Sequence, residues 1–273
     1  MAPQLLEAHD MGTTLDFDEQ TARHVETVYR SPDVVAQRAA IRRALALRPG
    51  ARVLDIGCGP GFLATEMAED VGPGGSVDGI DVSESMIAIA RRREPTAGSA
   101  PLRLQLGEAR ALPFADASFE VVVSTQVFEY IEDIAAALAE ARRVLRLGGR
   151  LLLLDTDWDS VVWYSRAPER MRRVLAAWDA HAADPHLPRT LAGHLRQAGF
   201  TIDDAWVLPV LNGAYDPNTY SAGLIALVEA FVAGRHGVTT EDAAAWAQEQ
   251  RELGDRYFFS LNRYVFVATR RWR

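Results

Sequence analysis

Glycines at alternate positions after a short apolar run form the first group of residues with a recognisable chemistry. Residues 52–61 read Arg-Val-Leu-Asp-Ile-Gly-Cys-Gly-Pro-Gly, so that Gly57, Gly59 and Gly61 directly follow an expected strand. A helical pattern begins at once after them, and a strand, glycine loop and helix together let the backbone approach a ligand closely. The carboxylate of Asp55, just before the loop, would repel a pyrophosphate but suits a ligand that carries an ammonium group.

The spacing of these glycines argues against two common nucleotide sites. The dinucleotide fingerprint G-x-G-x-x-G needs a third glycine three positions after the second, and Phe62 stands three positions after Gly59. No Gly-Lys-Ser/Thr follows the glycines, so the phosphate-binding P-loop of nucleoside triphosphatases is also absent from the sequence. A nicotinamide-dependent oxidoreductase is therefore the weaker alternative.

Further candidate ligand-binding residues follow the next two expected strands. Asp81 comes twenty residues after Gly61, where a carboxylate can accept both hydroxyls of a ribose or, equally, form a turn after a strand. Met86 can lie over an adenine ring, although a core methionine is the simpler interpretation. Glu108 and Ala109 follow the third expected strand, and on the residues alone Glu108 is a solvated loop acid.

The pattern Asp-x-Gly-x-Gly-x-Gly resembles motif I of the class I S-adenosylmethionine (SAM) methyltransferases. The segment 124–130, the Gly148-Gly149 pair and the run Ala198-Gly199-Phe200 fall in the order and spacing of that family. The resemblance covers roughly residues 50–210 and is closest to the small-molecule type 11, UbiE-like methyltransferases. Tyr130 stands where many relatives have histidine.

The resemblance implies SAM as cofactor and S-adenosylhomocysteine (SAH) as product, and it gives the candidate residues their roles. Asp55 supports the amino group, Asp81 takes the ribose, and Glu108 and Ala109 take the adenine. An N-terminal tyrosine closes over the cofactor, and an N-terminal arginine can pair with its carboxylate. The cofactor-binding residues that it implies are Tyr29, Arg38, Asp55, Gly57, Cys58, Gly59, Gly61, Asp81, Val82, Met86, Glu108, Ala109, Gln126 and Val127.

The acceptor side rests on fewer residues. Trp158, Trp163 and Tyr164 follow the fifth expected strand and can line an apolar acceptor pocket or pack a cap onto the sheet. His186 and Tyr29 are the candidate catalytic residues, and His181 is a further histidine near the cap for which an inert role is the simpler interpretation. The acids at 155, 157 and 159 lack the glycine and distal glutamate of a calcium loop, so no metal is expected.

Regular alternation of strands and helices must position these residues. The expected helices span 19–30, 32–47, 62–71, 84–93, 131–146, 167–182, 189–198 and 219–254. The expected strands span 52–56, 76–82, 102–106, 119–124, 150–154, 201–208 and 257–270. Five strand–helix units predict an α/β fold with a doubly wound parallel sheet. With the resemblance, this becomes a seven-stranded Rossmann-like methyltransferase fold whose last strand is antiparallel.

Helices in excess of this fold predict a cap. We expect residues 1–48 to form an N-terminal helical cap, and residues 49–273 to form the SAM-binding domain with cap insertions at about 160–188 and 216–255.

Composition limits the partners. The chain has 273 residues, 48% of them hydrophobic, and a formal charge of −8, which argues against nucleic acid because phosphate binding needs a basic face. One cysteine and the lack of a long apolar run or a signal-like N-terminus predict a cytoplasmic protein that does not enter a membrane. A homodimer is left open.

Together these features predict SAM-dependent methyl transfer by SN2 displacement. The expected acceptor is a small, partly apolar molecule such as a secondary metabolite, methylated at O, N or C. The alternative is a SAM-binding protein of the same fold that binds or cyclises a small ligand without transferring a methyl group.

Overall fold

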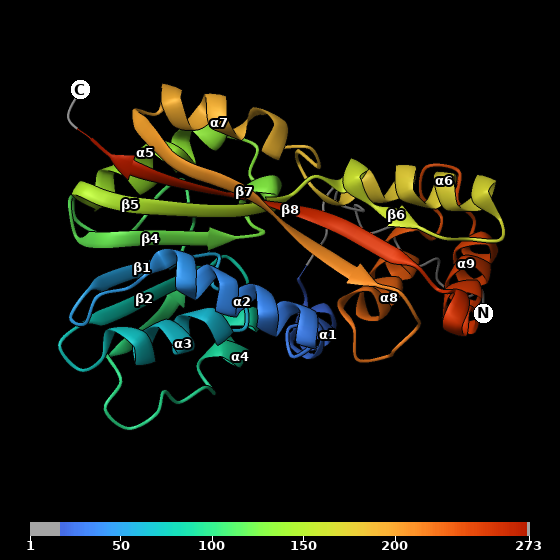
Figure 1. Ribbon diagram of the computed structural model, residues 1–273, viewed down its shortest axis with the longest axis horizontal. Coiled ribbons are helices and arrows are strands. Elements are labelled where there is room, and N and C mark those ends of the chain that lie inside the picture. Colours follow the sequence, from blue (N-terminus) through green and yellow to red (C-terminus); the bar gives the residue numbers. More distant parts are fainter. Residues whose placement is uncertain (1–16, 272–273) are drawn as a thin grey trace, which may run out of the picture.

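The fold is organised around one mixed β-sheet. A computed structural model describes residues 17–271. Within this range the sheet has eight strands in the order β3-β2-β1-β4-β5-β8-β6, and β7 also pairs with β8 (Figure 1). The strands are β1 (Arg52–Ile56), β2 (Ser76–Asp81), β3 (Leu102–Leu106), β4 (Phe119–Thr125), β5 (Leu145–Thr156), β6 (Val162–Trp163), β7 (Phe200–Asn212) and β8 (Phe259–Arg270).

Strand directions confirm the predicted fold and add one short strand to it. Strands β1 to β5 are mutually parallel, and β8 is antiparallel to both β5 and β7. The additional strand β6 pairs with the part of β8 that lies beyond the end of β5. The pairing of β5 with β8 ends at Thr156 and Arg263, and that of β6 begins at Val162 and Ser260. The sheet therefore has one strand more than the predicted seven.

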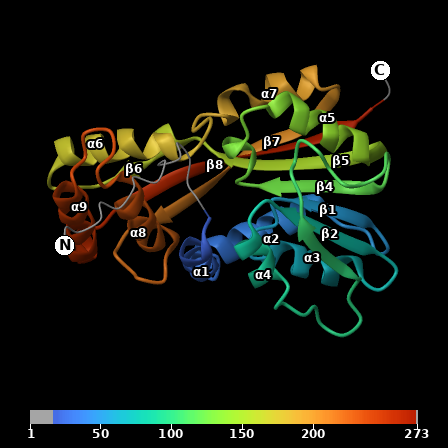
Figure 2. The same cartoon turned by 180° about the vertical axis from the view of Figure 1, so that it is seen from behind.

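Helices cover both faces of the sheet, as parallel strands require. One face packs against α2, α3 and α4, and the opposite face packs against α5 and α7 (Figure 2). Strand β4 shows the alternation, since Val121 and Val123 point to the first core and Val122 to the second. These helices are α2 (Pro32–Leu45), α3 (Phe62–Val71), α4 (Glu84–Ala90), α5 (Ile134–Val144) and α7 (Pro188–Gln197).

A third hydrophobic core lies beyond the carboxyl ends of the parallel strands. Strands β7 and β8 extend past the parallel strands and carry three more helices at that end (Figure 1). The fully buried Trp246 and Tyr257 belong to this core. The three helices are α6 (Pro168–Trp178), α8 (Tyr220–Val232) and α9 (Thr240–Glu252).

Two predicted element boundaries are wrong, for identifiable reasons. The stretch 219–254 is two helices, because Gly234 and Gly237 between them have φ of 76° and 79°, outside the helical region. The pair Gly148-Gly149, expected between the helix 131–146 and the strand 150–154, lies inside β5. Here the pairing with β4 shifts, and Gly148 has φ of 75°.

Helix α1 (Glu19–Val28) joins the third core to the half of the sheet that α4 covers. His24 Nε2 lies 2.8 Å from the carbonyl oxygen of Gly223 in α8, and Ser83 Oγ, before α4, donates to the carbonyl of Phe17 at 2.9 Å.

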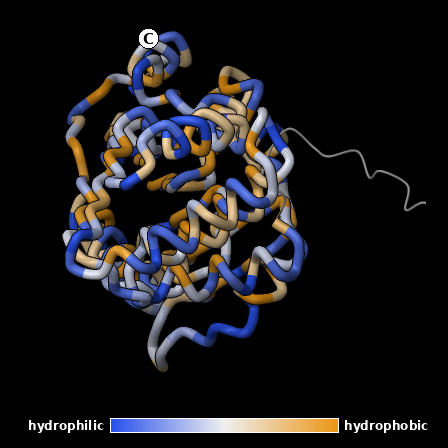
Figure 3. The backbone as a smooth tube through the Cα atoms, turned by 90° about the vertical axis from the view of Figure 1, so that its right-hand side faces the viewer, coloured by the Kyte–Doolittle hydropathy of each residue, from blue (hydrophilic) through white to orange (hydrophobic). Residues whose placement is uncertain are grey.

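Hydrophobic and hydrophilic residues alternate along the helical turns (Figure 3), as amphipathic helices require. Among residues 17–271 no helix has the length and apolar character needed to cross a membrane.

Candidate cofactor and acceptor site

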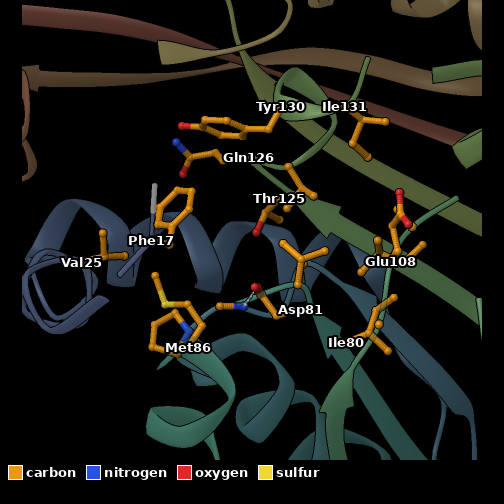
Figure 4. Close-up of a pocket in the computed structure, with 18 of the residues that line it drawn as sticks. Phe17, Val25, Ile80, Asp81, Met86, Glu108, Thr125, Gln126, Tyr130 and Ile131 are labelled. Atoms are coloured by element: carbon orange, nitrogen blue, oxygen red, sulfur yellow. Dashed lines mark hydrogen bonds between the residues drawn. The ribbon is translucent and has the colours of Figure 1, made fainter. Parts of the chain in front are cut away.

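A cavity of about 440 Å³ opens at the carboxyl ends of β1, β2 and β4 (Figure 4). Ligands of open α/β sheets bind at this edge. The cavity contains ten of the predicted cofactor-binding residues, which come from five separate segments of the chain. They are Tyr29, Gly57, Gly59, Asp81, Val82, Met86, Glu108, Ala109, Gln126 and Val127.

The three loop glycines are required for two different reasons. All have φ between 50° and 78°, a region that side chains disfavour. A Cβ on Gly57 would lie 2.2 Å from Val127 Cγ2, and a Cβ on Gly61 would lie 2.8 Å from Ala90 Cβ. A Cβ on Gly59 would meet no described atom within 4 Å, and Gly59 lines the cavity. Gly57 and Gly61 therefore allow the loop to pack, whereas Gly59 keeps the cavity free of a side chain.

Asp81 connects the loop to the cavity. Its Oδ2 accepts from the backbone N–H of Gly59 at 2.9 Å and its Oδ1 accepts from that of Ser83 at 2.9 Å. Burial raises the pKa of Asp81, and these backbone donors act against that rise. Each oxygen keeps a lone pair, so the carboxylate can accept two further hydrogen bonds on the cavity side.

Asp55 lies beneath the loop and does not line the cavity. It is 2% exposed, and its Oδ2 has no partner among the described residues. Burial, with a smaller contribution from the charge of Asp81, raises the pKa of Asp55 to about 8. A cation bound near the loop would favour its ionised form, which is the electrostatic role expected of it.

Two segments, one after β2 and one after β3, supply further lining residues of the cavity. Val82 and Met86 follow Asp81 at the end of β2, and Glu108 and Ala109 follow β3. Glu108 also forms an ion pair with Arg110, which lines the same cavity. In Figure 4, Met86 and Glu108 lie at opposite ends of the cavity, with Asp81 between them.

The chain after β4 is held in an unusual conformation. Gln126 has φ of 58°, which is uncommon for a residue other than glycine. Asp155, at the end of β5, accepts from the backbone N–H groups of Val127 at 3.1 Å and Glu129 at 3.3 Å. Burial raises the pKa of Asp155 well above its usual range and that of Glu129 to about 7. The strained segment is thus fixed from β5, and it presents Gln126 to the cavity.

A second cavity, of about 70 Å³, adjoins the first, and we name it the aromatic chamber. The two cavities share Phe17, Val25, Tyr29, Gln126 and Tyr130. Tyr130, Gln126 and Phe17 lie next to one another in Figure 4. The remaining walls of the chamber come from the third core, and they are Val28, Trp158, Trp178, Tyr220, Leu224 and Leu227.

The structure places other predicted residues outside both cavities. The Arg38 guanidinium donates to Glu66 at 2.9 Å and to the Tyr29 carbonyl at 2.6 Å. Cys58 is buried under the loop against Gly79. Trp163 and Tyr164, with Trp158, line a separate outer groove beside α6.

His186, a predicted catalytic residue, belongs to a surface cluster rather than to either cavity. Its Nδ1 lies 3.2 Å from Asp157 Oδ1 and 3.9 Å from Asp159 Oδ2. The guanidinium of Arg189 donates to both carboxylates, at 2.8 Å to Asp157 and 2.5 Å to Asp159. Both carboxylates are therefore paired with the same arginine.

Several lining residues were not among the predicted site residues. Phe17, Trp178 and Tyr220 reach the chamber from distant parts of the chain, and no local motif marks them. Tyr130 could have been found, because it ends the segment 124–130 that the resemblance had already singled out.

The comparisons with known proteins agree with this geometry. A family model described as a methyltransferase domain, of type 11, matches residues 54–153. The demethylmenaquinone methyltransferase of Bacillus cytotoxicus is 31% identical over 129 residues, which cover 47% of this chain and 54% of that protein. The aligned regions span 34% to 54% of the length of the first curated relatives.

Solved structures share the fold over most of the chain. The phosphoethanolamine N-methyltransferase 2 of Haemonchus contortus, in complex with SAM, has a TM-score of 0.61 and 19% identity, covering 94% of this chain and 58% of that one. The [4+2]-cyclase SpnF has a TM-score of 0.58 and 22% identity, covering 88% and 82%. The predicted resemblance and fold are confirmed: residues 54–153 match a type 11 methyltransferase domain, and the solved structures share the fold over most of this chain.

Proposed function

We propose that this protein transfers a methyl group from SAM to a small, largely apolar acceptor that binds in the aromatic chamber. The observation that carries the proposal is the shared wall of the two cavities. Phe17, Gln126 and Tyr130 line both, so a molecule in the chamber lies against whatever occupies the larger cavity. The helices α1, α6 and α8 would act as a cap that excludes water.

The residues of the larger cavity suit SAM in size and in chemistry. Asp81 would accept the ribose hydroxyls, Glu108 and Ala109 would contact the adenine, and Gly59 would allow close backbone approach. Buried Asp55, without a partner for Oδ2, would favour a positively charged ligand above it. When bound, SAM supplies a methyl group already activated by its sulfonium. The chain then has only to hold the acceptor in line and keep the site dry.

The chamber residues position the acceptor rather than take up its proton. Burial raises the pKa of Tyr29 to about 12 and that of Tyr130 well above 10. Both hydroxyls therefore stay protonated near neutral pH and act as hydrogen-bond donors or acceptors. An acceptor that reacts as a lone-pair or carbon nucleophile needs no base from these residues.

Two measurements test the proposal together. Isothermal titration calorimetry should show binding of SAM and SAH to the wild-type protein and a loss of at least about tenfold in affinity for Asp81→Ala, because charge-assisted hydrogen bonds contribute about 1.5–3 kcal/mol each. Radiolabelled SAM with a panel of phenols, amines and enols should yield a labelled product. An Arg189→Ala variant is the control, since its surface cluster lies outside both cavities.

The alternative activity gives a different result in the same experiment. SpnF, described as a [4+2]-cyclase, has this fold, so the fold alone does not determine methyl transfer. A protein that binds SAM with Asp81-dependent affinity but labels no acceptor would favour ligand binding or cyclisation. A protein that binds neither SAM nor SAH would contradict both functions.

A further inference from the structure

One tryptophan stands between the aromatic chamber and the outer groove. The chamber has a volume of about 70 Å³, and the groove, which runs beside α6, has a volume of about 920 Å³. Among the described residues, Trp158 is the only one that lines both of these cavities. The two cavities are therefore neighbours, and Trp158 forms the wall that they share.

Backbone and ring contacts hold Trp158 in place. It begins the short helix η2 (Trp158–Ser160) directly after β5, and its backbone N–H donates to the carbonyl of Pro185 at 2.9 Å. The residue is buried, and its ring meets those of Trp178 and His181 edge-on, with centroids 5.6 Å and 4.6 Å apart. Edge-on contacts of this kind stabilise aromatic pairs, and a closely packed core keeps its side chains in one rotamer. The wall is therefore a fixed part of the chamber.

The groove beyond this wall has an apolar surface. Val162, Tyr164 and Phe258 line it and are 57%, 44% and 41% exposed, and the backbone N–H of Tyr164 donates to the carbonyl of Phe258 at 2.9 Å. Neighbouring exposed apolar side chains are typical of surfaces that bind apolar ligands. An apolar chain that passed from the chamber into the groove would therefore be bound there, and the side chain of Trp158 stands in its way.

We propose that Trp158 is a specificity-determining residue that limits the length of the acceptor. This inference rests on the proposed function, because it concerns the molecule that the chamber holds beside the cofactor. The chamber ends at Trp158 on one side and at the larger cavity, which the cofactor occupies, on the other. The acceptor is therefore a compact molecule without a long apolar substituent. A smaller residue at position 158 joins the chamber to the groove and admits a longer molecule.

Ethylbenzene and hexylbenzene share a ring and differ in chain length, so together they test this limit. The protein is labelled with 5-fluorotryptophan and studied by fluorine NMR with SAH present. Trp178 lines the chamber but not the groove, and Trp163 lines the groove but not the chamber, so their signals report where each probe lies. In the wild-type protein, ethylbenzene should shift the Trp178 signal, and hexylbenzene should not shift both signals together.

Trp158→Leu should remove the limit. Hexylbenzene should then shift the signals of Trp178 and Trp163 together. Its affinity, measured from the Trp178 signal, should exceed that of ethylbenzene by at least about tenfold, because each methylene that becomes buried favours binding by about fourfold. In the wild-type protein the affinity measured from this signal should not rise with chain length.

A matched control separates the wall from a general loosening of the third core. Trp163→Leu removes an equally buried tryptophan from the groove alone and should leave the chain-length limit in place. Urea denaturation shows which variants are folded, and Trp158→Phe, a smaller change, replaces Trp158→Leu if the latter does not fold. The inference would be overturned if hexylbenzene shifted both signals in the wild-type protein, or if the limit persisted in the folded variant at position 158. Absence of SAH binding in calorimetry would instead count against the proposed function.

Discussion

Replacing Gly57 by alanine tests how the glycine loop and the segment after β4 fit together. The new methyl group would lie 2.2 Å from Val127 Cγ2 and 2.8 Å from Cγ1, at a residue with φ of 70°. The left-handed backbone costs about 1–2 kcal/mol for alanine, and overpacking adds about 1–3 kcal/mol. We therefore expect Gly57→Ala to lower the free energy of unfolding by about 2–5 kcal/mol.

A second glycine separates these two contributions. Gly98 has φ of 91°, and a Cβ there would meet no described atom within 4 Å. Gly98→Ala should therefore show the backbone cost of about 1–2 kcal/mol without the clash. Combining Gly57→Ala with Val127→Ala removes the two Cγ atoms and should restore part of the loss, giving a coupling energy of about 1 kcal/mol or more.

Urea denaturation measures these stabilities, and calorimetry measures the affinity for SAH. Gly57→Ala should weaken SAH binding because the displaced Val127 and Gln126 line the cavity, and Gly98→Ala should leave binding unchanged. The reasoning would be refuted if Gly57→Ala were no more destabilising than Gly98→Ala. Unchanged SAH affinity in a folded Gly57→Ala variant would refute the connection between loop packing and the site.

Three further predictions concern other buried groups. Since the pKa of Asp55 is raised to about 8 from 3.8, the folded state binds more protons between these values. The unfolding free energy should fall as pH rises from 4 to 8. Urea denaturation at several pH values should show that this free energy depends less on pH in Asp55→Asn than in the wild-type protein. Gly223→Ala places a methyl 2.4 Å from a valine of α1 and should destabilise by about 1–3 kcal/mol in thermal unfolding, whereas Gly193→Ala in open space on α7 should stabilise by about 0.4–1 kcal/mol. Equal effects would contradict the close contact between α1 and α8. Arg38→Met removes an ion pair to Glu66 and should cost about 2–3 kcal/mol in urea denaturation, less than a fully buried pair because the Glu66 side chain is 24% exposed. A large loss of SAH affinity at unchanged stability would instead support its predicted contact with the cofactor.

The features that could be predicted from the sequence depend on short-range constraints. Gly57, Gly59 and Gly61 occupy backbone conformations that glycine favours, and their positive φ is set within a few residues. Asp81 and Glu108 follow directly from the strand ends that precede them. Because parallel strands align their carboxyl ends, locating each strand in the sequence was enough to bring these residues to one cavity.

The acceptor side depends on packing between segments that lie far apart in the sequence. Tyr220 and Trp178 reach the aromatic chamber through the third core, whose partners no local pattern identifies. No motif in the sequence distinguishes His181 from His186. The structure buries His181 fully against the chamber and places His186 in a surface ion-pair cluster. Trp158 lines both the chamber and the outer groove, whereas Trp163, five residues on in β6, lines only the groove.

The most direct measurement is a crystal structure of the protein grown with SAH. We expect the ribose hydroxyls within hydrogen-bonding distance of the Asp81 carboxylate, the adenine beside Ala109, and the sulfur facing the wall of Gln126 and Tyr130 that the two cavities share. SAH bound elsewhere, or electron density for a different nucleotide across the glycine loop, would contradict the account.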